Sequence, residues 1–581
     1  MILKRILEYW ESNGDALPAG YQPAFITKKI VLDADGRLVG EGVVALSGEK
    51  RGPKVGKTIV VPREQPQRTG AIRPRLVQDN PEYALGFPKP EADPKKVEHR
   101  HTAYRDQLRA CYEETGEASL KAVLAFLESG VAVSPEFREK IDPAGDELVF
   151  EVGGTLPTDL PSVRAYWTRD EDAATGTCLV TGTVGKIVDR MPFAIKGVPG
   201  GQTSGTMLVS VNNPSGESYG LSAAGNSPIG AVAAEGICNG LNRLLANSKQ
   251  SFRVGDSVYV YWTNASDEFD LFSFFREPDV EAVTALLNSV RRGTPASEVS
   301  GPDFFVLGLT ANASRIVIRD FHETTVGKVQ EHLGKWFRRL EIVGANGSPS
   351  KPLGVFQLAA SLYRDAKDIP RHIPIEIMRS AFSGSPLPKH LLALAVRRNT
   401  IMQGPFAEYQ KKRQISVARL ALIKAVIVSH QTETEETNLS TLNHNHPDPA
   451  YHCGRLLSVL DSIQRIAIPG LNSTLVDKHF GNACGSPGIA FGGLLKDATS
   501  AHLPKLRKNR RGAYVALDQR LQEVLGKIEN DFPKTLDFER QGLFALGFYH
   551  QRADDLAAAR ANKELKEIAE ATTTEIESES E

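Results

Sequence analysis

Cysteine is scarce in this sequence, which limits what cysteine can build. Five cysteines are scattered over 581 residues, and none forms a Cys-x-x-Cys pair. A sparse set with an odd number of members argues against a disulfide framework and against a zinc finger. The simplest compartment for such a chain is the reducing cytoplasm.

Long apolar runs are also missing. No stretch approaches the roughly 20 apolar residues that a membrane-spanning helix needs. The opening sequence, MILKRILEYWES, has charges within its apolar part and is therefore not a secretory signal. Its apolar residues Ile2, Ile6 and Tyr9 share one face of a helix, which predicts an amphipathic helix at the start of the chain.

No catalytic pattern is evident either. The sequence shows no nucleophile beside a base, no carboxylate pattern typical of a two-metal site and no helicase motif. His444, His446 and Asp448 have donor atoms that suit a metal, but they lie in a segment rich in Pro and Asn. We therefore expect a protein that is not an enzyme, with no catalytic residue, no metal site and no cofactor.

The net charge is close to zero, so one local concentration of positive charge stands out. The whole chain has a formal net charge of -1, whereas residues 50–75 contain eight cations and the single acid Glu64. Glycine and proline interrupt this basic segment, which predicts a semi-rigid loop. Positive charge concentrated in such a loop suggests a polyanion partner, most simply nucleic acid. The alternative is a solvated loop without a partner. The cations are Lys50, Arg51, Lys54, Lys57, Arg63, Arg68, Arg73 and Arg75.

The basic segment contains a near match to a phosphate-binding P-loop. In the sequence GPKVGKT, which begins at Gly52, three residues separate the two glycines, where the motif has four. The residues that follow, IVVP, predict a strand ended by proline, whereas a P-loop needs a helix whose N-terminal amides hold the phosphate. We therefore expect Lys54 and Lys57 to contact a nucleic-acid backbone and not a nucleotide.

A second basic cluster lies far along the chain, between expected helices. It consists of Lys505, Arg507, Lys508, Arg510 and Arg511. Cations at this density suit the phosphates of a single strand, and a solvated loop between helices is the alternative. Arg315 and Arg319 should share one face of a strand, where nucleic acid or structural ion pairs would explain them about equally well.

Length and periodicity predict an α+β protein with several domains, because 581 residues are too many for one ordinary core. Residues 1–150 should form an N-terminal α+β region that contains the basic segment. Residues 151–430 should form a mixed α/β and then helical central region, followed by a polar linker at residues 431–448. A C-terminal helical bundle is expected at residues 449–560, and an acidic disordered tail at residues 561–581.

Individual elements can be placed within these regions. Strands are expected at residues 26–32 and 38–46, joined by a turn at Asp35-Gly36. Ser227-Pro228 predicts the start of a helix that includes Leu244 and Leu245. Further helices are expected at residues 101–130 and 415–428, and further strands at residues 258–262, 304–309 and 315–318.

Nine blocks of sequence follow one another along the chain. The first three are MILKRILEYWE, LPAGYQP and, at residues 68–87, RTGAIRPRLVQDNPEYALGF. The others are SYGLSAAGNSPIG, NRLLANSKQSFRVGDSVYVYW, FFVLGLTANASRIVIRDF, YHCGRLLSVLDSIQ, HFGNACGSPGIAF and QGLFALGFYHQR. This succession spans nearly the whole chain and resembles the large subunit of the type I-C CRISPR surveillance complex, Cascade.

The resemblance implies a non-catalytic subunit of a crRNA-guided interference complex. Such a subunit recognises the protospacer-adjacent motif in double-stranded DNA, helps to open the duplex and stabilise the R-loop, and helps to recruit the helicase–nuclease. Protein then reads the short motif, and RNA pairing reads the rest of the target. The implied partners are crRNA, target duplex DNA, the Cascade backbone subunits, the subunit that holds the crRNA handle, a small subunit and the helicase–nuclease. The C-terminal bundle resembles the small subunit, which in this family is often also made separately from an internal start.

With this role, the basic residues and their neighbours divide into two groups. Phosphate contacts, which fix the register on DNA without reading sequence, are assigned to Lys54, Lys57, Arg63 and Arg68. Arg73, Gln78 and Asn80 are candidates for reading base edges, because Arg pairs with guanine and Asn or Gln with adenine. Two other interpretations stay open: a metal-dependent nuclease or RNA-processing enzyme of a CRISPR system, and a purely structural scaffold.

Overall fold

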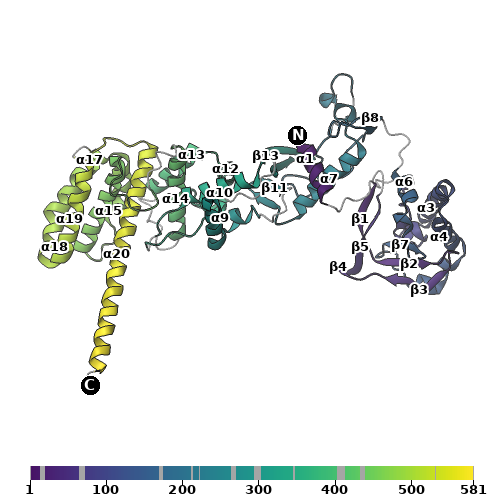
Figure 1. Cartoon of the computed structure of the whole chain (residues 1–581), viewed down its shortest axis with the longest axis horizontal. Coiled ribbons are helices and arrows are strands. Elements are labelled where there is room, and N and C mark those ends of the chain that lie inside the picture. Colours follow the sequence, from purple (N-terminus) through teal and green to yellow (C-terminus); the bar gives the residue numbers. More distant parts are fainter. Residues whose placement is uncertain are drawn as a thin grey trace. The chain divides into compact units, whose positions relative to one another are not determined.

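The computed structural model confirms the α+β class. It describes residues 2–13, 20–63, 72–168, 175–210, 214–221, 223–263, 270–292, 303–344, 347–401, 413–431, 439–529 and 532–579. Figure 1 shows strands concentrated toward the N-terminal part of the chain and helices toward the C-terminal part. The chain divides into two compact units. The first comprises Met1–Ala194 and Met207–Leu241, and the second comprises Ile195–Thr206 and Asn242–Glu581.

A four-stranded sheet in the order β3-β2-β7-β6 forms the centre of the first unit. The strands are β2 (Lys28–Leu32), β3 (Leu38–Ala45), β6 (Gln78–Asp79) and β7 (Leu148–Val152). The predicted turn joins β2 to β3, and Gly36 there has φ +83°, with the carbonyl of Ala122 2.4 Å from where a Cβ would lie. This turn therefore requires glycine. Because β7 is an inner strand, the domain boundary expected at residue 150 falls inside the sheet.

Helices of 4 to 22 residues accompany this sheet in the first unit. They are α2 (Pro81–Ala84), α3 (Pro94–Thr115), α4 (Ala118–Glu128), α5 (Pro135–Arg138) and α6 (Pro161–Thr168). The single helix expected at residues 101–130 is divided in two, because Gly116 adopts the left-handed conformation that ends α3. Phe126 lies between Phe137 and Phe150, with ring centroids 5.5 and 6.1 Å away, so these rings join the helices to the sheet.

The predicted amphipathic helix is confirmed as α1 (Ile2–Ser12), with Ile6, Leu7 and Tyr9 buried. It packs on α7 (Ala231–Ala246), where a Cβ at Gly236 would lie 2.6 Å from a methyl group of Leu7. The start of α7 differs from the expected Ser227-Pro228. The chain before it is extended and pairs with other loops, since the Pro228 carbonyl accepts a hydrogen bond from the amide of Leu179.

A separate three-stranded sheet in the first unit has the order β1-β5-β4. β1 (Tyr21–Ile26) pairs antiparallel with the second half of β5 (Lys54–Pro62), and the first half of β5 forms a hairpin with β4 (Glu49–Arg51). The strand predicted to follow Lys57 and to end at Pro62 is therefore confirmed. Because a strand follows Lys57, the helix N-terminus that a P-loop needs is missing from this segment.

The second unit contains an antiparallel four-stranded sheet in the order β10-β11-β12-β13. The strands are β10 (Ser251–Val254), β11 (Ser257–Thr263), β12 (Phe304–Asn312) and β13 (Arg315–Thr324). Aromatic rings stack between neighbouring strands, Tyr261 on Phe304 at 5.5 Å and Trp262 on Phe305 at 5.3 Å. The three strands predicted from the sequence are present, and each is longer than predicted.

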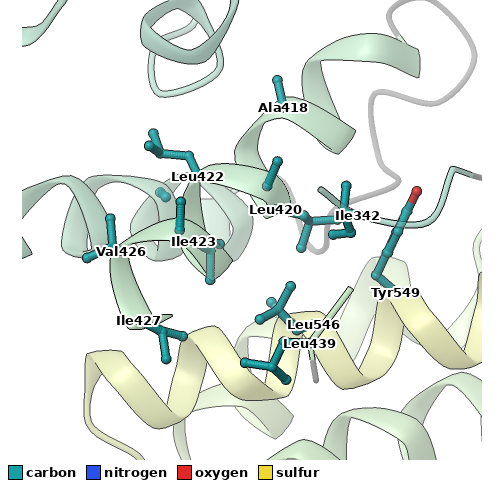
Figure 2. Packing of buried hydrophobic residues seen from close by; sticks show 14 of the residues in the cluster. Ile342, Ala418, Leu420, Leu422, Ile423, Val426, Ile427, Leu439, Leu546 and Tyr549 are labelled. Atoms are coloured by element: carbon teal, nitrogen blue, oxygen red, sulfur yellow. The ribbon is translucent and has the colours of Figure 1, made fainter. Parts of the chain in front are cut away.

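Helices complete the second unit and share one continuous core with one face of the sheet. In chain order they are α8 (Ser273–Arg276), α9 (Val280–Arg292), α10 (Val326–Leu340), α11 (Val355–Ala360), α12 (His372–Ser383), α13 (Lys389–Ile401), α14 (Arg413–Ser429), α15 (Pro449–Ala467), α16 (Leu475–Gly485), α17 (Pro487–Asp497), α18 (Leu503–Asn509), α19 (Arg511–Ile528) and α20 (Phe538–Glu579). Residues 418–429 of α14 are buried, which explains why this sequence is apolar except for Arg419, Lys424 and Ser429. Figure 2 shows Ile423 and Ile427 of α14 on the side that faces Leu546 of α20.

The expected linker at residues 431–448 is not a domain boundary where the structure describes it. Leu439 is fully buried and His446 nearly so, and the amide of Val343 donates a hydrogen bond to the carbonyl of Ser440. Leu439 and His446 thus pack into their own unit, while Thr441, His444 and Asn445 stay exposed. The helices of the expected bundle at residues 449–560 are present, but their core is continuous with that of α10–α14.

Two glycines let α15 and α20 cross at backbone contact. A Cβ at Gly454 would lie 1.9 Å from the carbonyl oxygen of Phe544, and a Cβ at Gly547 would lie 2.0 Å from that of Tyr451. Real Cβ atoms essentially never approach a neighbouring atom this closely. Glycine at both positions therefore sets the distance between the two longest described helices of the C-terminal part.

A buried polar network joins α15 to α19 and α20. At its centre Arg455 is fully buried, and its Nε donates to Oε1 of Gln551 at 3.0 Å while its Nη2 donates to Oε1 of Glu523 at 2.9 Å. The segment before α15 joins the network in separate places. His444 Nδ1 lies 2.8 Å from Glu523, whereas His446 Nδ1 accepts from the amide of Asp448. The Nδ1 atoms of His444 and His446 thus serve different hydrogen bonds.

Acidification is expected to destabilise this part of the second unit. Burial lowers the pKa of His550 to about 3, while its unfolded-state pKa is near 6.5. Between these values only the unfolded state binds the proton, so stability falls as the pH falls, by about 2 kcal/mol at pH 5. Calorimetry from pH 7.5 to 5 should show this loss. The stability of a His550→Gln variant should depend less on pH. If its stability depended on pH as that of the wild type does, His550 would not be the group responsible.

The last helix continues where the sequence predicts disorder. α20 reaches Glu579 and so includes nearly all of the expected acidic tail at residues 561–581. Its sequence from residue 557 is rich in Ala, Glu and Lys, which are strong helix formers, and this local propensity outweighs the repulsion between the acids. Across the described residues, no helix has a stretch long and apolar enough to cross a membrane.

Candidate functional site

The β4–β5 hairpin presents the lysines of the basic segment to solvent. Its two strands meet at Gly52-Pro53, with Lys50 opposite Val55 and Arg51 opposite Lys54. Lys50, Lys54 and Lys57 are exposed. Within the described residues none of these three ammonium groups has an ion pair. The hairpin thus holds unneutralised positive charge close to its tip, the arrangement that a phosphate backbone attracts.

Local packing explains the other residues of the hairpin. The carboxylate of Glu49 accepts hydrogen bonds from the amide of Thr58 at 3.0 Å and from its hydroxyl at 2.6 Å. This acid is therefore tied across the strands and does not pair with the lysines. A Cβ at Gly56 would lie 2.4 Å from the carbonyl oxygen of Ile26. The second glycine of the P-loop-like sequence serves this close approach of two strands, which explains it without a nucleotide.

Arg63 has a structural position in the first unit. Its side chain is buried, Nη2 lies 2.8 Å from Oε1 of Glu235, and the guanidinium lies 4.4 Å from the ring centre of Phe193. The indole N–H of Trp167 donates hydrogen bonds to the backbone carbonyls of Gly20 and Arg63. The expected phosphate contact by Arg63 is therefore not available in this structure, because its charge is neutralised inside the protein.

The two amide side chains expected to read bases are used inside the protein. Gln78 lies on β6, is fully buried and donates its amide to Oε2 of Glu147 at 3.0 Å. Asn80 caps α2, accepting from the amides of Glu82 and Tyr83. Because Asn80 is the N-cap, its side-chain carbonyl oxygen is occupied by the amides of the helix. Gln78 is therefore not presented to a base edge, so the structure does not support the base-reading expectation for Gln78, whereas Asn80 is half-buried with its carbonyl oxygen occupied.

The arginines beside these amides are only partly accessible. Arg75 Nη1 lies 3.3 Å from Oε2 of Glu147, and the Arg75 amide donates to the carboxylate of Asp79. The same Asp79 also acts on Tyr104: burial is the main cause, and the charge of Asp79 the second cause, that raise the pKa of Tyr104 well above its usual value. Arg73 is half-buried, with its amide 3.4 Å from the hydroxyl of Tyr83. Arg68 and the side chain of Arg51 lie outside the described structure.

The second basic cluster lies on helices and not in a loop. Lys505, Arg507 and Lys508 belong to α18, Arg511 begins α19, and Arg510 forms the break between them. All five cations are exposed, while Leu503 and Leu506 anchor α18 in the core. In the described part of the chain none of the five forms an ion pair. The N-terminus of α19 adds the positive end of a helix dipole to this surface.

The strand arginines are arranged differently from the expectation. Arg315 and Arg319 are both exposed on β13, which is an edge strand. Ile318 pairs with Leu309 and Asp320 with Gly308, so Arg319 is the extra residue of a β-bulge. A bulge breaks the alternation of side chains, so the shared face inferred from the spacing of four residues between Arg315 and Arg319 does not follow.

A family model for "CRISPR-associated protein (Cas_Csd1)" matches residues 3–555, nearly the whole chain. The chain belongs to the Cas_Csd1 family. No curated protein matches it. The match supports the CRISPR role expected from the nine sequence blocks at the level of the family.

Membership of the Cas_Csd1 family gives a CRISPR context to the geometry but does not say which residues form a functional site. The exposed cations of the β4–β5 hairpin and of the α18–α19 cluster are the parts of this family member best suited to nucleic acid. Sequence reasoning found these cations but missed the acids that pair with Arg63 and Arg75. Glu147 and Glu235 lie 72 and 172 residues away from Arg75 and Arg63, and no local pattern in the sequence links them.

Proposed function

We propose that this Cas_Csd1 chain is the non-catalytic large subunit of a type I-C crRNA-guided interference complex and grips duplex DNA beside the protospacer-adjacent motif. The observation that carries the proposal is the β4–β5 hairpin, with three exposed lysines that have no ion-pair partner among the described residues. Family membership supports the CRISPR context. Lysines suit phosphate contacts, which position a protein on DNA without reading its sequence.

The second basic cluster has a separate task in this proposal. Five exposed cations on α18 and α19 suit the backbone of a single strand, which has to be held after the duplex opens. The partners are crRNA, target duplex DNA, the backbone and handle-binding subunits, a small subunit and the helicase–nuclease. Gln78 is fully buried, so the two base-reading candidates that remain partly exposed are Arg73 and Asn80.

The proposal is tested by removing the positive charges of the three hairpin lysines. A K50Q/K54Q/K57Q triple variant, assembled with partner subunits and crRNA, should bind matching duplex on the order of 100-fold more weakly in a mobility-shift titration. The slope of log affinity against log salt should fall by roughly 3, because each lost phosphate contact removes about 0.9. The loss should be equal for duplexes with and without the motif, since the lysines contact phosphates.

A matched control separates local contacts from overall charge. K95Q/K96Q/K121Q removes the same charge from exposed lysines of α3 and α4 in the same unit. It should retain wild-type affinity and salt slope. The proposal fails if the hairpin variant binds like the control while the complex still assembles.

A further inference from the structure

Two histidines and a glutamate of the second unit converge at one point on α12 and α13. His372 and Glu376 are four residues apart and therefore share a face of α12. His390 is the second residue of α13, and its Nε2 lies 2.9 Å from Oε2 of Glu376. One ligand atom from each of the three residues lies within 4.8 Å of the other two. We propose that His372, Glu376 and His390 bind a divalent transition-metal ion, with Zn²⁺ as the best match.

The donor set indicates the class of ion. Two imidazole nitrogens and one carboxylate form a typical three-residue set for zinc, which leaves a fourth position to water. Mg²⁺ and Ca²⁺ prefer oxygen donors and would gain little from the two imidazoles. Bound Zn²⁺ would also neutralise the carboxylate. Oε2 of Glu376 is inaccessible to solvent and forms no hydrogen bond of good geometry, although it lies close to His390.

Contacts outside the cluster hold both helices in place. At the start of α12, a Cβ at Gly255 would lie 2.2 Å from the carbonyl of Arg371, so the β10–β11 turn packs directly against the residue before His372. The connection to α13 is fixed as well, because the amide of Leu387 donates to Oγ of Ser429 and its carbonyl lies 2.8 Å from Nε2 of His430. The ligands are thus brought together by the fold, which reduces the ordering that binding requires.

Exposure of the cluster gives an ion a path to it. The side chains of His390 and Glu376 are 47% and 26% exposed, and the rings of His372 and His390 are 6.5 Å apart at their centres. Small rotations of exposed imidazoles bring the nitrogens to the separations of a four-coordinate ion. The bound ion would fasten the N-terminus of α12 to that of α13. None of the three ligand residues belongs to the proposed DNA-binding surface.

Metal titration of the full-length chain tests the inference. Equilibrium dialysis against Zn²⁺ should show one equivalent bound in a saturable manner, while Mg²⁺ and Ca²⁺ at the same concentration should not compete. Co²⁺ in place of Zn²⁺ should give the strong visible absorption of a four-coordinate site. Zn²⁺ should also raise the melting temperature of the wild-type chain, because an ion that binds only the folded state stabilises it.

Single variants locate the ion. H372A and H390A should each weaken Zn²⁺ binding at least tenfold and abolish the Co²⁺ spectrum. E376Q keeps the shape of the side chain and should weaken binding in the same direction. H99A, which removes an exposed histidine of α3, is the control and should bind as wild type. Absence of saturable binding, or equal binding by all four variants, would overturn the inference.

Discussion

Gly454→Ala is expected to lower the free energy of unfolding of the second unit by about 3 kcal/mol. The new methyl group would meet the carbonyl oxygen of Phe544 at 1.9 Å, and backbone atoms cannot move aside as a flexible side chain can. α15 and α20 would have to separate, which would open the core between them along several turns. Gly547→Ala should have a similar effect, because its methyl group would meet the carbonyl of Tyr451.

Hydrogen exchange of peptides from α15 and α20 is the sharpest measurement, because it reports on these helices within the full chain. Gly526→Ala is the matched control. Gly526 lies in α19 with open space around its Cα, so alanine there should raise helix stability by up to about 1 kcal/mol. If Gly454→Ala protected α15 as well as the wild type does, the close crossing of the two helices would be wrong.

Arg455→Ala is expected to destabilise the same region by about 3 to 5 kcal/mol. The guanidinium is fully buried and makes hydrogen bonds to Gln551 and Glu523, so its removal leaves a buried amide without its partner and a void beside α20. Its third contact is His452, whose pKa is lowered to about 4 mainly by burial. Neutral His452 accepts from Arg455, and the variant loses this support too.

Calorimetry of the variant should show a lower melting temperature for the second unit. Arg540→Ala provides the comparison, because Arg540 is 46% exposed and pairs with Asp448 at 3.1 Å. A surface pair of this kind contributes about 1 kcal/mol or less. Equal effects of the two substitutions would show that the buried network contributes no more than a surface ion pair.

Periodic patterns in the sequence predicted much of the fold, because they reflect local physics. The apolar runs at residues 258–262 and 415–428 correspond to β11 and α14, because a strand or helix that is buried on all sides is apolar along its length. Boundaries were less predictable. The polar segment at residues 431–448 suggested a linker, but partners distant in sequence bury part of it.

The candidate site was predictable only in part, for a related reason. A run of cations is visible in the sequence, and Lys50, Lys54 and Lys57 are exposed as the interpretation requires. Whether a cation is neutralised depends on residues that the fold brings near. Arg63 is paired inside the protein by Glu235, and only the tertiary structure shows this. The cluster of His372, Glu376 and His390 has the same property, because a helix end and a connection separate its members.

The continuous core of the second unit bears on any shorter product of the same gene. A polypeptide that began near residue 449 would contain α15–α20 but lack α13 and α14. The side of α20 around Gly542, where Leu392, Ile423 and Ile427 approach within 3.1 Å of a Cβ position, would then face water. Such a fragment would carry an apolar surface that its own residues cannot cover. It would therefore be more stable against a second protein surface than alone, and in the full chain α13 and α14 supply that surface.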